Sequence, residues 1–170
     1  MILRPDYINA ITPFIDAPLV KILAGVRRCG KSTIFDMLVQ ELEHKNIPSD
    51  NIIKRKYTNP DYEDFSAKDM YSDLKKAIKS TGRHYLFLDE LQEIKGWEKV
   101  VNSLREDFDV DIYVTGSNSK LMSSEISTYL TGRYVLIPVY TLSFIEYLTF
   151  KNKDISSARD VFDEYIQYGG

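Results

Sequence analysis

Gly25-Val26-Arg27-Arg28-Cys29-Gly30-Lys31-Ser32-Thr33 is the stretch that decides the fold, because it matches the phosphate-binding pattern GxxxxGK[ST] at every fixed position. An apolar run, residues 19–24, precedes this stretch, and a helical pattern with Ile34, Leu38 and Leu42 four residues apart follows it. The order strand, loop, helix is the context that the pattern requires. We therefore interpret residues 25–33 as a nucleotide-binding P-loop.

The chemistry of phosphate binding explains the spacing within this loop. Gly25 and Gly30 allow the backbone to turn and to approach a ligand where a Cβ would clash, so that successive N–H groups converge on phosphate oxygens. Lys31 supplies a positive charge for the β- and γ-phosphates of ATP, and the Ser32 hydroxyl is placed to bind Mg²⁺. The alternative is a glycine turn before a helix with an unrelated lysine, which the flanking pattern disfavours.

Composition describes an ordinary globular chain of 170 residues, with 44% hydrophobic and 28% charged residues, and predicts one main domain. The net charge of −3 does not favour nucleic acid or an anionic membrane, although a local basic patch leaves nucleic acid open. Apolar runs such as residues 134–140 are too short to span a bilayer, and the N-terminus lacks the apolar segment of a signal peptide. We expect a cytoplasmic protein with no membrane contact.

The one cysteine, Cys29, excludes an internal disulfide and fits a reducing compartment. A phosphatase-type loop would need Arg six residues after the cysteine, where the chain has Phe35. We therefore interpret Cys29 as a variable position of the P-loop, with redox sensitivity as the alternative. His44 and His84 have no flanking Cys or His and are expected to be structural.

A second candidate site begins at Tyr85-Leu-Phe-Leu-Asp89-Glu90. Four consecutive large apolar residues predict a strand buried on both faces, and two carboxylates follow at its carboxyl end, where open α/β sheets bind ligands. In this place Asp89 would hold Mg²⁺, directly or through water, and Glu90 would orient and polarise the attacking water. Alone the pattern also fits a solvated helix cap, but its position after a P-loop favours the catalytic interpretation.

Two further strands carry signs of sheet edges. Residues 52–57 include Lys54, Arg55 and Lys56, and charge of this kind discourages pairing with another chain. Residues 134–139 contain Pro138, which cannot donate to a strand ladder. With strands also at 19–24, 85–88 and 111–115, the fold class predicted is an α/β P-loop NTPase sandwich with a parallel sheet of order 5-1-4-3-2. Helices are expected at residues 4–15, broken at Pro13, and at 34–42, 67–80, 97–108 and 156–168.

Polar residues after the fourth strand and one arginine complete the predicted site. Gly116-Ser117-Asn118 follows that strand, and we favour Asn118, with Ser117 next, as the group that senses the γ-phosphate; a plain polar turn is the alternative. Arg133 is predicted to reach phosphates in its own subunit or to act as a finger on a neighbour, against a surface arginine as the alternative. The side chains of Arg27 and Arg28 are expected to meet a partner or acidic groups.

Several motifs together resemble a known family. They are Gly25–Thr33, residues 86–92 (Leu-Phe-Leu-Asp-Glu-Leu-Gln) followed by Trp97, residues 114–121 (Val-Thr-Gly-Ser-Asn-Ser-Lys-Leu), residues 130–134 (Leu-Thr-Gly-Arg-Tyr) and residues 142–147 (Leu-Ser-Phe-Ile-Glu-Tyr). The set is similar to the AAA+ superfamily ATPases of the AAA-14 type with a DUF4143 tail, from about Val20 to Gly170. The resemblance implies an ATP-binding core of the additional-strand, catalytic-glutamate type, with Lys31, Ser32, Asp89, Glu90 and Ser117 or Asn118 in the roles above.

Similar proteins continue into a C-terminal domain beyond the Tyr-Gly-Gly at which this sequence ends. We therefore expect an ATPase domain at residues 1–150 and, at 151–170, the start of a helical segment that leads to a domain absent here. The helix at 156–168 would present Val161, Tyr165 and Tyr168 with little after it to cover them. A fragment of this kind would bind ATP and hydrolyse it poorly if turnover needs the missing part or an oligomer.

The sequence leaves three functions to compare. The leading hypothesis is a Mg²⁺-dependent ATPase that couples hydrolysis to a conformational change in an unknown protein partner or in the absent domain, with a homo-oligomer left open. The second is a nucleotide-gated or DNA-associated binding module with little hydrolysis. The third, a small-molecule phosphotransferase, normally needs an Arg-rich lid that the sequence lacks. GTP is not expected, because the Asn-Lys-x-Asp guanine signature is absent.

Overall fold

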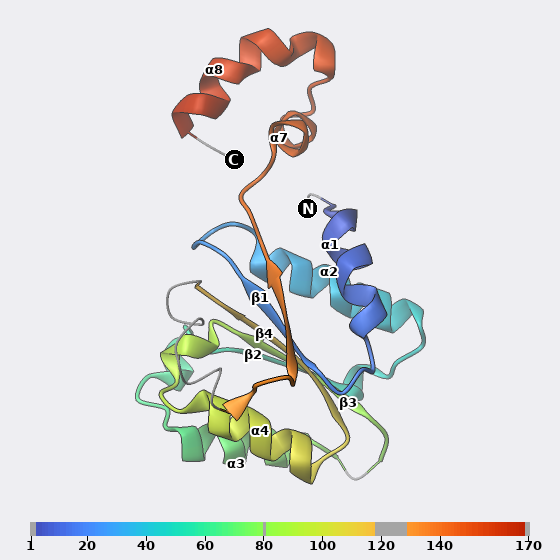
Figure 1. Ribbon diagram of the computed structural model, residues 1–170, viewed down its shortest axis with the longest axis vertical. Helices are drawn as coiled ribbons and strands as arrows, with labels where there is room; N and C mark the ends of the chain where they lie inside the picture. Colours follow the sequence, from blue (N-terminus) through green and yellow to red (C-terminus); the bar gives the residue numbers. More distant parts are fainter. Residues whose placement is uncertain (1–2, 80, 118–128, 169–170) are drawn as a thin grey trace.

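A five-stranded parallel sheet forms the centre of the fold. The computed structural model of the chain describes residues 3–79, 81–117 and 129–168 (Figure 1). The strands lie in the order β2-β3-β4-β1-β5, which confirms the predicted order read from the other edge. Their bounds are β1 Val20–Ala24, β2 Ile52–Lys56, β3 His84–Asp89, β4 Val110–Gly116 and β5 Tyr134–Pro138. The cationic and the proline-bearing strands, β2 and β5, are the two edges, as their sequences predict.

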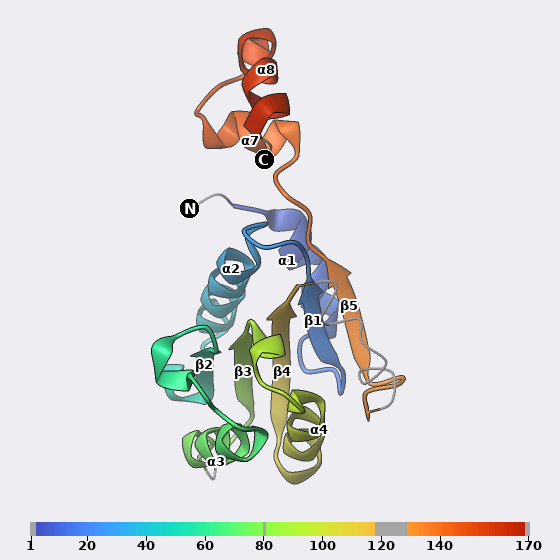
Figure 2. The same cartoon turned by 90° about the vertical axis from the view of Figure 1, so that its left-hand side faces the viewer.

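Helices cover both faces of the sheet (Figures 1 and 2). On one face lie α1 (Pro5–Ile11), followed by the 3₁₀ turn η1 (Thr12–Phe14), and α2 (Lys31–His44); on the other lie α3 (Ala67–Ala77) and α4 (Trp97–Asp107). Three further short turns lie between these elements: η2 (Ser49–Asn51), η3 (Pro60–Tyr62) and η4 (Leu91–Glu93). No helix in the described ranges is long and apolar enough to cross a membrane.

Alternation along the strands divides the core into two layers. In β3, Phe87 faces the layer of α1 and α2, where its ring stacks on Tyr113 of β4, whereas Leu86 and Leu88 face the layer of α3 and α4. All six positions of β3 are buried, as expected for a strand covered on both faces. The continuous apolar run in the sequence therefore indicates an inner strand. The carboxyl end of this strand is packed between both layers.

The helix predicted at 67–80 ends earlier than its periodicity indicates. It begins with a capping box between Ser66 and Asp69 and ends at Ala77, after which Ile78 is extended. The backbone N–H of Lys79 then donates to Nε2 of the buried His84 over 3.1 Å. The turn into β3 is thus fixed by a histidine side chain, which confirms the structural role expected for His84.

The C-terminal helices form a pair that stands away from the sheet (Figure 2). After α7 (Phe144–Phe150) come η5 (Ile155–Ser157) and α8 (Ala158–Tyr168). Val161 of α8 is buried against Tyr147 and Leu148 of α7. The expectation that Val161 lacks a cover is therefore wrong, because α7 precedes it and packs on it. The predicted boundary at residue 150 falls between α7 and α8, and the division into domains stays a prediction.

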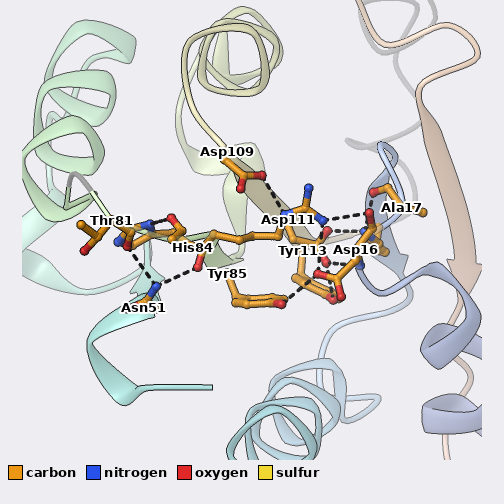
Figure 3. A network of polar contacts seen from close by, with 12 residues as sticks. Asp16, Ala17, Asn51, Thr81, His84, Tyr85, Asp109, Asp111 and Tyr113 are labelled. Carbon is orange, nitrogen blue, oxygen red and sulfur yellow. Dashed lines mark hydrogen bonds and ion pairs between the residues drawn. The ribbon is translucent and has the colours of Figure 1, made fainter. Parts of the chain in front are cut away.

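Buried polar groups brace the amino ends of the strands (Figure 3). The Lys21 ammonium is paired with the Asp111 carboxylate, and both side chains are almost fully buried. Burial lowers the pKa of Lys21, and the charge of Asp111 opposes this effect. Tyr113 donates to Asp111 over 2.9 Å, and the backbone N–H of Asp16 donates to the same carboxylate over 2.9 Å. This network lies at the amino ends of the strands, whereas the P-loop follows the carboxyl end of β1.

Candidate functional site

The loop between β1 and α2 has a backbone that few residue types can adopt. Gly30, which precedes α2, has φ 94°, and Arg28 has φ 69°. A Cβ on Gly25 would lie 2.2 Å from the carbonyl oxygen of Val139 and 2.7 Å from the sulfur of Cys29. Gly25 is therefore required by close packing at the end of β5. Among the residues that the structure describes, no side chain caps the first turn of α2, so its first amides remain available to an anion.

Lys31 lies across the loop at the start of α2. Its ammonium donates to the carbonyl oxygens of Gly25 over 3.0 Å and Val26 over 3.1 Å. The same nitrogen lies 3.7 Å from Oε1 of Glu90, and the lysine is only 4% exposed. The structure thus brings Lys31 and Glu90 together, as their predicted roles require.

The acidic pair at the end of β3 lies against the loop. Asp89 Oδ2 accepts a hydrogen bond from the Ser32 hydroxyl over 2.8 Å, and Asp89 itself is buried. Glu90 follows with φ 54° and ψ 47°, the left-handed conformation that a non-glycine residue rarely adopts. That conformation turns the chain out of the strand immediately after Asp89. The two adjacent carboxylates therefore contact different side chains: Asp89 contacts Ser32, and Glu90 lies near Lys31.

Thr115 joins the two carboxyl residues and is a site residue that the sequence reasoning missed. Its hydroxyl donates to Asp89 Oδ1 and accepts from the backbone N–H of Glu90 over 2.9 Å. Thr115 is fully buried in β4, the neighbour of β3. The predicted strand order could have identified Thr115. It places the fourth strand beside the third, and so the Thr115 hydroxyl beside Asp89 and Glu90.

The loops at the carboxyl ends of the strands enclose a cleft of about 530 Å³. Its lining comes from the loops after β1, β2, β3 and β4: Arg27, Arg28, Ser32, Lys56, Thr58, Glu90, Gln92, Glu93 and Ser117. Small-molecule sites commonly measure roughly 300–1,000 Å³. Ser117 thus lies at the predicted place, whereas Asn118, the favoured sensor, lies outside the described residues. Thr33 continues α2 and is half-buried.

The two loop arginines are exposed at this cleft. Arg27 and Arg28 have no ion-pair partner within the described part of the chain, and Val26 beside them is 55% exposed. Cys29, by contrast, is buried at 3% exposure and packs in the core beneath α1 and α2. Its burial argues against the alternative of a redox-sensitive thiol, since oxidation requires an accessible sulfur.

Arg133 does not join the other predicted residues. It precedes β5, whose first residue Tyr134 pairs with Val20, at the amino ends of the parallel strands. Its guanidinium donates to Asn102 over 3.0 Å and lies 3.9 Å from Glu106. The P-loop follows the opposite ends of the same strands, so contact with a nucleotide in its own subunit is excluded by this placement. A role on a neighbouring subunit stays a prediction.

Arg4 is a second residue that the sequence reasoning missed, since a lone arginine before a proline carries no signal. It is 4% exposed, and its guanidinium donates to the P-loop carbonyl of Cys29 over 2.9 Å and to that of Tyr140 over 3.0 Å. Its Nε donates to Glu146 of α7 over 2.8 Å. One buried side chain therefore connects the P-loop with the C-terminal helices.

The oxygen donors at this edge fit a hard divalent cation. Mg²⁺ is usually held by one or two protein oxygens together with phosphates and water, and here the Ser32 hydroxyl and the Asp89 carboxylate are adjacent. The described residues hold no cluster of three or more His, Cys, Asp or Glu that would form an all-protein metal site. The donor set thus suits a metal that arrives with a phosphate ligand.

Comparisons with known proteins agree with this geometry. The sequence profile of the AAA_14 family, described as an AAA domain, matches residues 17–148. An uncharacterized protein of Haemophilus influenzae is 38% identical over 174 residues, covering 100% of this chain and 44% of that protein. Uncharacterized protein MJ1544 of Methanocaldococcus jannaschii is 31% identical over 163 residues, covering 89% and 35%. The chain thus spans less than half the length of these two relatives.

Solved structures share the fold at low sequence identity. A DNA polymerase III gamma subunit-related protein of Thermotoga maritima gives a TM-score of 0.55 at 11% identity, covering 91% of this chain and 57% of the other. Drosophila ORC bound to AT-rich DNA and Cdc6 gives 0.53 at 12%, covering 94% and 62%. Family and fold together support nucleotide binding. The chain belongs to the AAA_14 family of AAA domains and has the fold of a P-loop nucleoside triphosphatase.

Proposed function

We propose that this domain binds ATP with Mg²⁺ and hydrolyses it, and that hydrolysis is coupled to a conformational change. The observation that carries the proposal is that two pairs of residues distant in the sequence lie side by side at the carboxyl ends of the strands. Ser32 bonds to Asp89 over 2.8 Å, and Lys31 lies 3.7 Å from Glu90. A metal-binding pair and a cation–base pair side by side are what hydrolysis of a triphosphate requires.

Binding would rest on the loop and the first turn of α2. The uncapped amides of this turn would donate to phosphate oxygens, and Lys31 would exchange its bonds with the Gly25 and Val26 carbonyls for the β- and γ-phosphates. Ser32 and Asp89 would hold Mg²⁺, which neutralises negative charge on the phosphates when it is bound. The exposed Arg28 guanidinium, in the same cleft, adds positive charge near the phosphates.

Hydrolysis would use Glu90 as the general base. A water oxygen forms a bond to the γ-phosphorus as the bond between that phosphorus and the β–γ bridging oxygen breaks, and the Glu90 carboxylate takes the proton of the water. ADP and inorganic phosphate leave, and Glu90 returns its proton to solvent. Thr115 supports this step because it fixes the backbone N–H of Glu90 and the carboxylate of Asp89.

Coupling would pass through Arg4. This side chain contacts the P-loop carbonyl of Cys29 and the Glu146 carboxylate of α7, so a movement of the loop changes the anchoring of the C-terminal helices. Whatever part of the whole protein follows α8 would then receive the movement. We also propose that Arg133 acts on the nucleotide of a neighbouring copy, because the P-loop of its own chain lies at the opposite ends of the strands.

Two variants test the proposal. Lys31→Ala should weaken equilibrium ATP binding by about tenfold or more, because a charge-assisted contact is lost. Glu90→Gln should retain ATP and lose turnover by about 10²-fold or more, the usual contribution of a general base. Glu43→Gln is the matched control, since it removes the same charge from an exposed position on α2 that does not line the cleft.

Phosphate release is measured with and without duplex DNA. Equal turnover in Glu90→Gln and the parent chain would refute the assignment of the base. Binding of DNA with a steep salt dependence, combined with no ATP turnover, would favour the binding-module alternative.

A further inference from the structure

Gln92 lies two residues after Glu90 and contacts its carboxylate. The amide nitrogen of Gln92 donates to Glu90 Oε2 over 2.6 Å, and it also lies 3.3 Å from Glu93 Oε1. The opposite orientation of the amide would place its oxygen against two carboxylates, so the charges fix which end of the amide faces Glu90. Glu90 is thereby held at both oxygens, Oε1 by Lys31 at 3.7 Å and Oε2 by Gln92.

The other end of the Gln92 amide is unsatisfied. Its carbonyl oxygen is buried and has no hydrogen-bond partner among the described residues. A buried acceptor without a partner costs free energy, so the side chain keeps this position because of what its nitrogen does. The bond to Glu90 is the shortest one that the nitrogen makes.

The hydrophobic neighbours of Gln92 anchor the turn in which it lies. The turn η4 is anchored by Leu91 and Ile94, which are fully buried in the core of the α3 and α4 layer. Gln92 is half-buried and lines the cleft. Its polar group therefore acts toward the cleft, whereas the hydrophobic neighbours hold the turn.

We propose that Gln92 is the positioning residue of the catalytic base, and this rests on the proposed ATP hydrolysis. A bound triphosphate draws the Lys31 ammonium toward its phosphates, which removes one of the two groups that hold Glu90. Gln92 then becomes the side-chain contact that keeps the Glu90 carboxylate directed at the attacking water. Because the amide donates only N–H groups to Glu90, it leaves the carboxylate free to accept the proton.

The test uses two substitutions of similar size in the 170-residue chain. Gln92→Met removes the donor and also the unsatisfied acceptor, so it should fold at least as well as the parent. It should keep the ATP dissociation constant within about threefold and lower kcat by about tenfold or more, the loss expected when a general base is misdirected. Gln92→Glu replaces the donor with a second carboxylate against Glu90, so it should lower kcat at least as far as Gln92→Met and leave the ATP dissociation constant within about threefold.

Glu43→Gln, an exposed glutamate on α2 that does not line the cleft, is the control for the loss of a polar side chain, and its kcat should match the parent. A kcat in both Gln92 variants equal to that of an active parent would overturn the role of Gln92 and leave the proposed ATPase intact. A parent that binds ATP without turnover would overturn both proposals. A parent that binds no ATP would do the same and would also reject the nucleotide site.

Discussion

Ser32 and Asp89 are 57 positions apart in the sequence, and the hydroxyl of the first donates to the carboxylate of the second over 2.8 Å. The bond joins the first turn of α2 to the end of β3. Both elements are fixed by the core, α2 through its buried Ile34 and Phe35 and β3 through burial along its length. The hydrogen bond between Ser32 and Asp89 is therefore set by the fold, and it marks the place where a metal with a phosphate ligand would be held.

Replacement of Ser32 tests this pair. Ser32→Ala removes one of the two oxygen groups available to Mg²⁺, so ATP binding in the presence of Mg²⁺ should weaken by about tenfold, while binding without Mg²⁺ should change little. Isothermal titration with and without EDTA measures both. Ser72→Ala, an exposed serine on α3, is the control. An unchanged Mg²⁺ dependence in Ser32→Ala would contradict the assignment of the metal ligands.

The contact between Arg4 and Glu146 predicts a pH-dependent attachment of α7. Burial opposes ionisation of Glu146, but hydrogen bonds from Arg4 and Ser143 outweigh this effect and lower its pKa below the ordinary 4.5. A carboxylate with a lowered folded-state pKa stabilises the fold above the ordinary pKa, and this stabilisation is lost as the pH falls through the folded-state value. The protection factors of α7 amides against hydrogen exchange should therefore fall as the pH falls below about 4.5.

Glu146→Gln should remove this pH dependence, because it has no charge to lose. At pH 7 the variant should also exchange faster in α7 and in the P-loop, since Arg4 contacts both. Lys151→Ala, which breaks the exposed pair with Glu164 on the same helices, is the control. Faster exchange confined to α7 would show that the P-loop is not coupled to it.

Removal of Asp111 tests the polar network at the amino ends of the strands. Asp111→Ala leaves the Lys21 ammonium buried without its partner, and loss of one member of a buried pair costs about 3–5 kcal/mol of unfolding free energy. ATP affinity at a temperature where the variant is folded should stay at the parent value, because the P-loop lies at the other ends of the strands. Urea unfolding measures the first effect and ATP titration the second.

Asp50→Ala breaks the exposed pair with Lys79 and should leave the unfolding midpoint nearly unchanged. An equally small effect of Asp111→Ala would mean that the Lys21–Asp111 pair adds little to stability.

Arg133 should matter only between subunits. If it reaches the nucleotide of a neighbour, the specific activity of the parent should rise with protein concentration, and Arg133→Ala should be low at every concentration. Mixing Arg133→Ala with Glu90→Gln should then restore activity, because each mixed pair contains one complete site. Arg159→Ala, an exposed arginine on α8, serves as the control for lost charge. Activity of Arg133→Ala equal to the parent would contradict the role.

The sequence predicts the sheet and most of the site for physical reasons. The P-loop spacing fixes a strand, a turn and a helix, and the apolar run before Asp89 requires an inner strand. Strand edges follow from Pro138 and the cations of β2, so the order of the sheet can be predicted before the structure is seen.

Other parts depend on tertiary contacts that no local pattern reports. Helix α3 ends at Ala77 because His84 binds the backbone of Lys79, and Thr115 becomes a site residue because β4 lies beside β3. The position of Arg133 depends on strand direction, because Arg133 precedes β5 and therefore lies at the amino ends of the parallel strands. Arg4 gives no signal because the P-loop carbonyl of Cys29 and the carboxylate of Glu146, which it contacts, lie 25 and 142 positions away in the sequence.

The central claim is that residues 25–33 hold the triphosphate while Asp89 and Glu90 manage its metal and water. A crystal structure of Glu90→Gln with ATP and Mg²⁺ tests it most directly. The account predicts the β-phosphate on the amides of the loop and first turn of α2, the metal on the Ser32 hydroxyl with Asp89 beside it, and a water between residue 90 and the γ-phosphate. ATP bound elsewhere, or a metal held without Ser32 and Asp89, would contradict it.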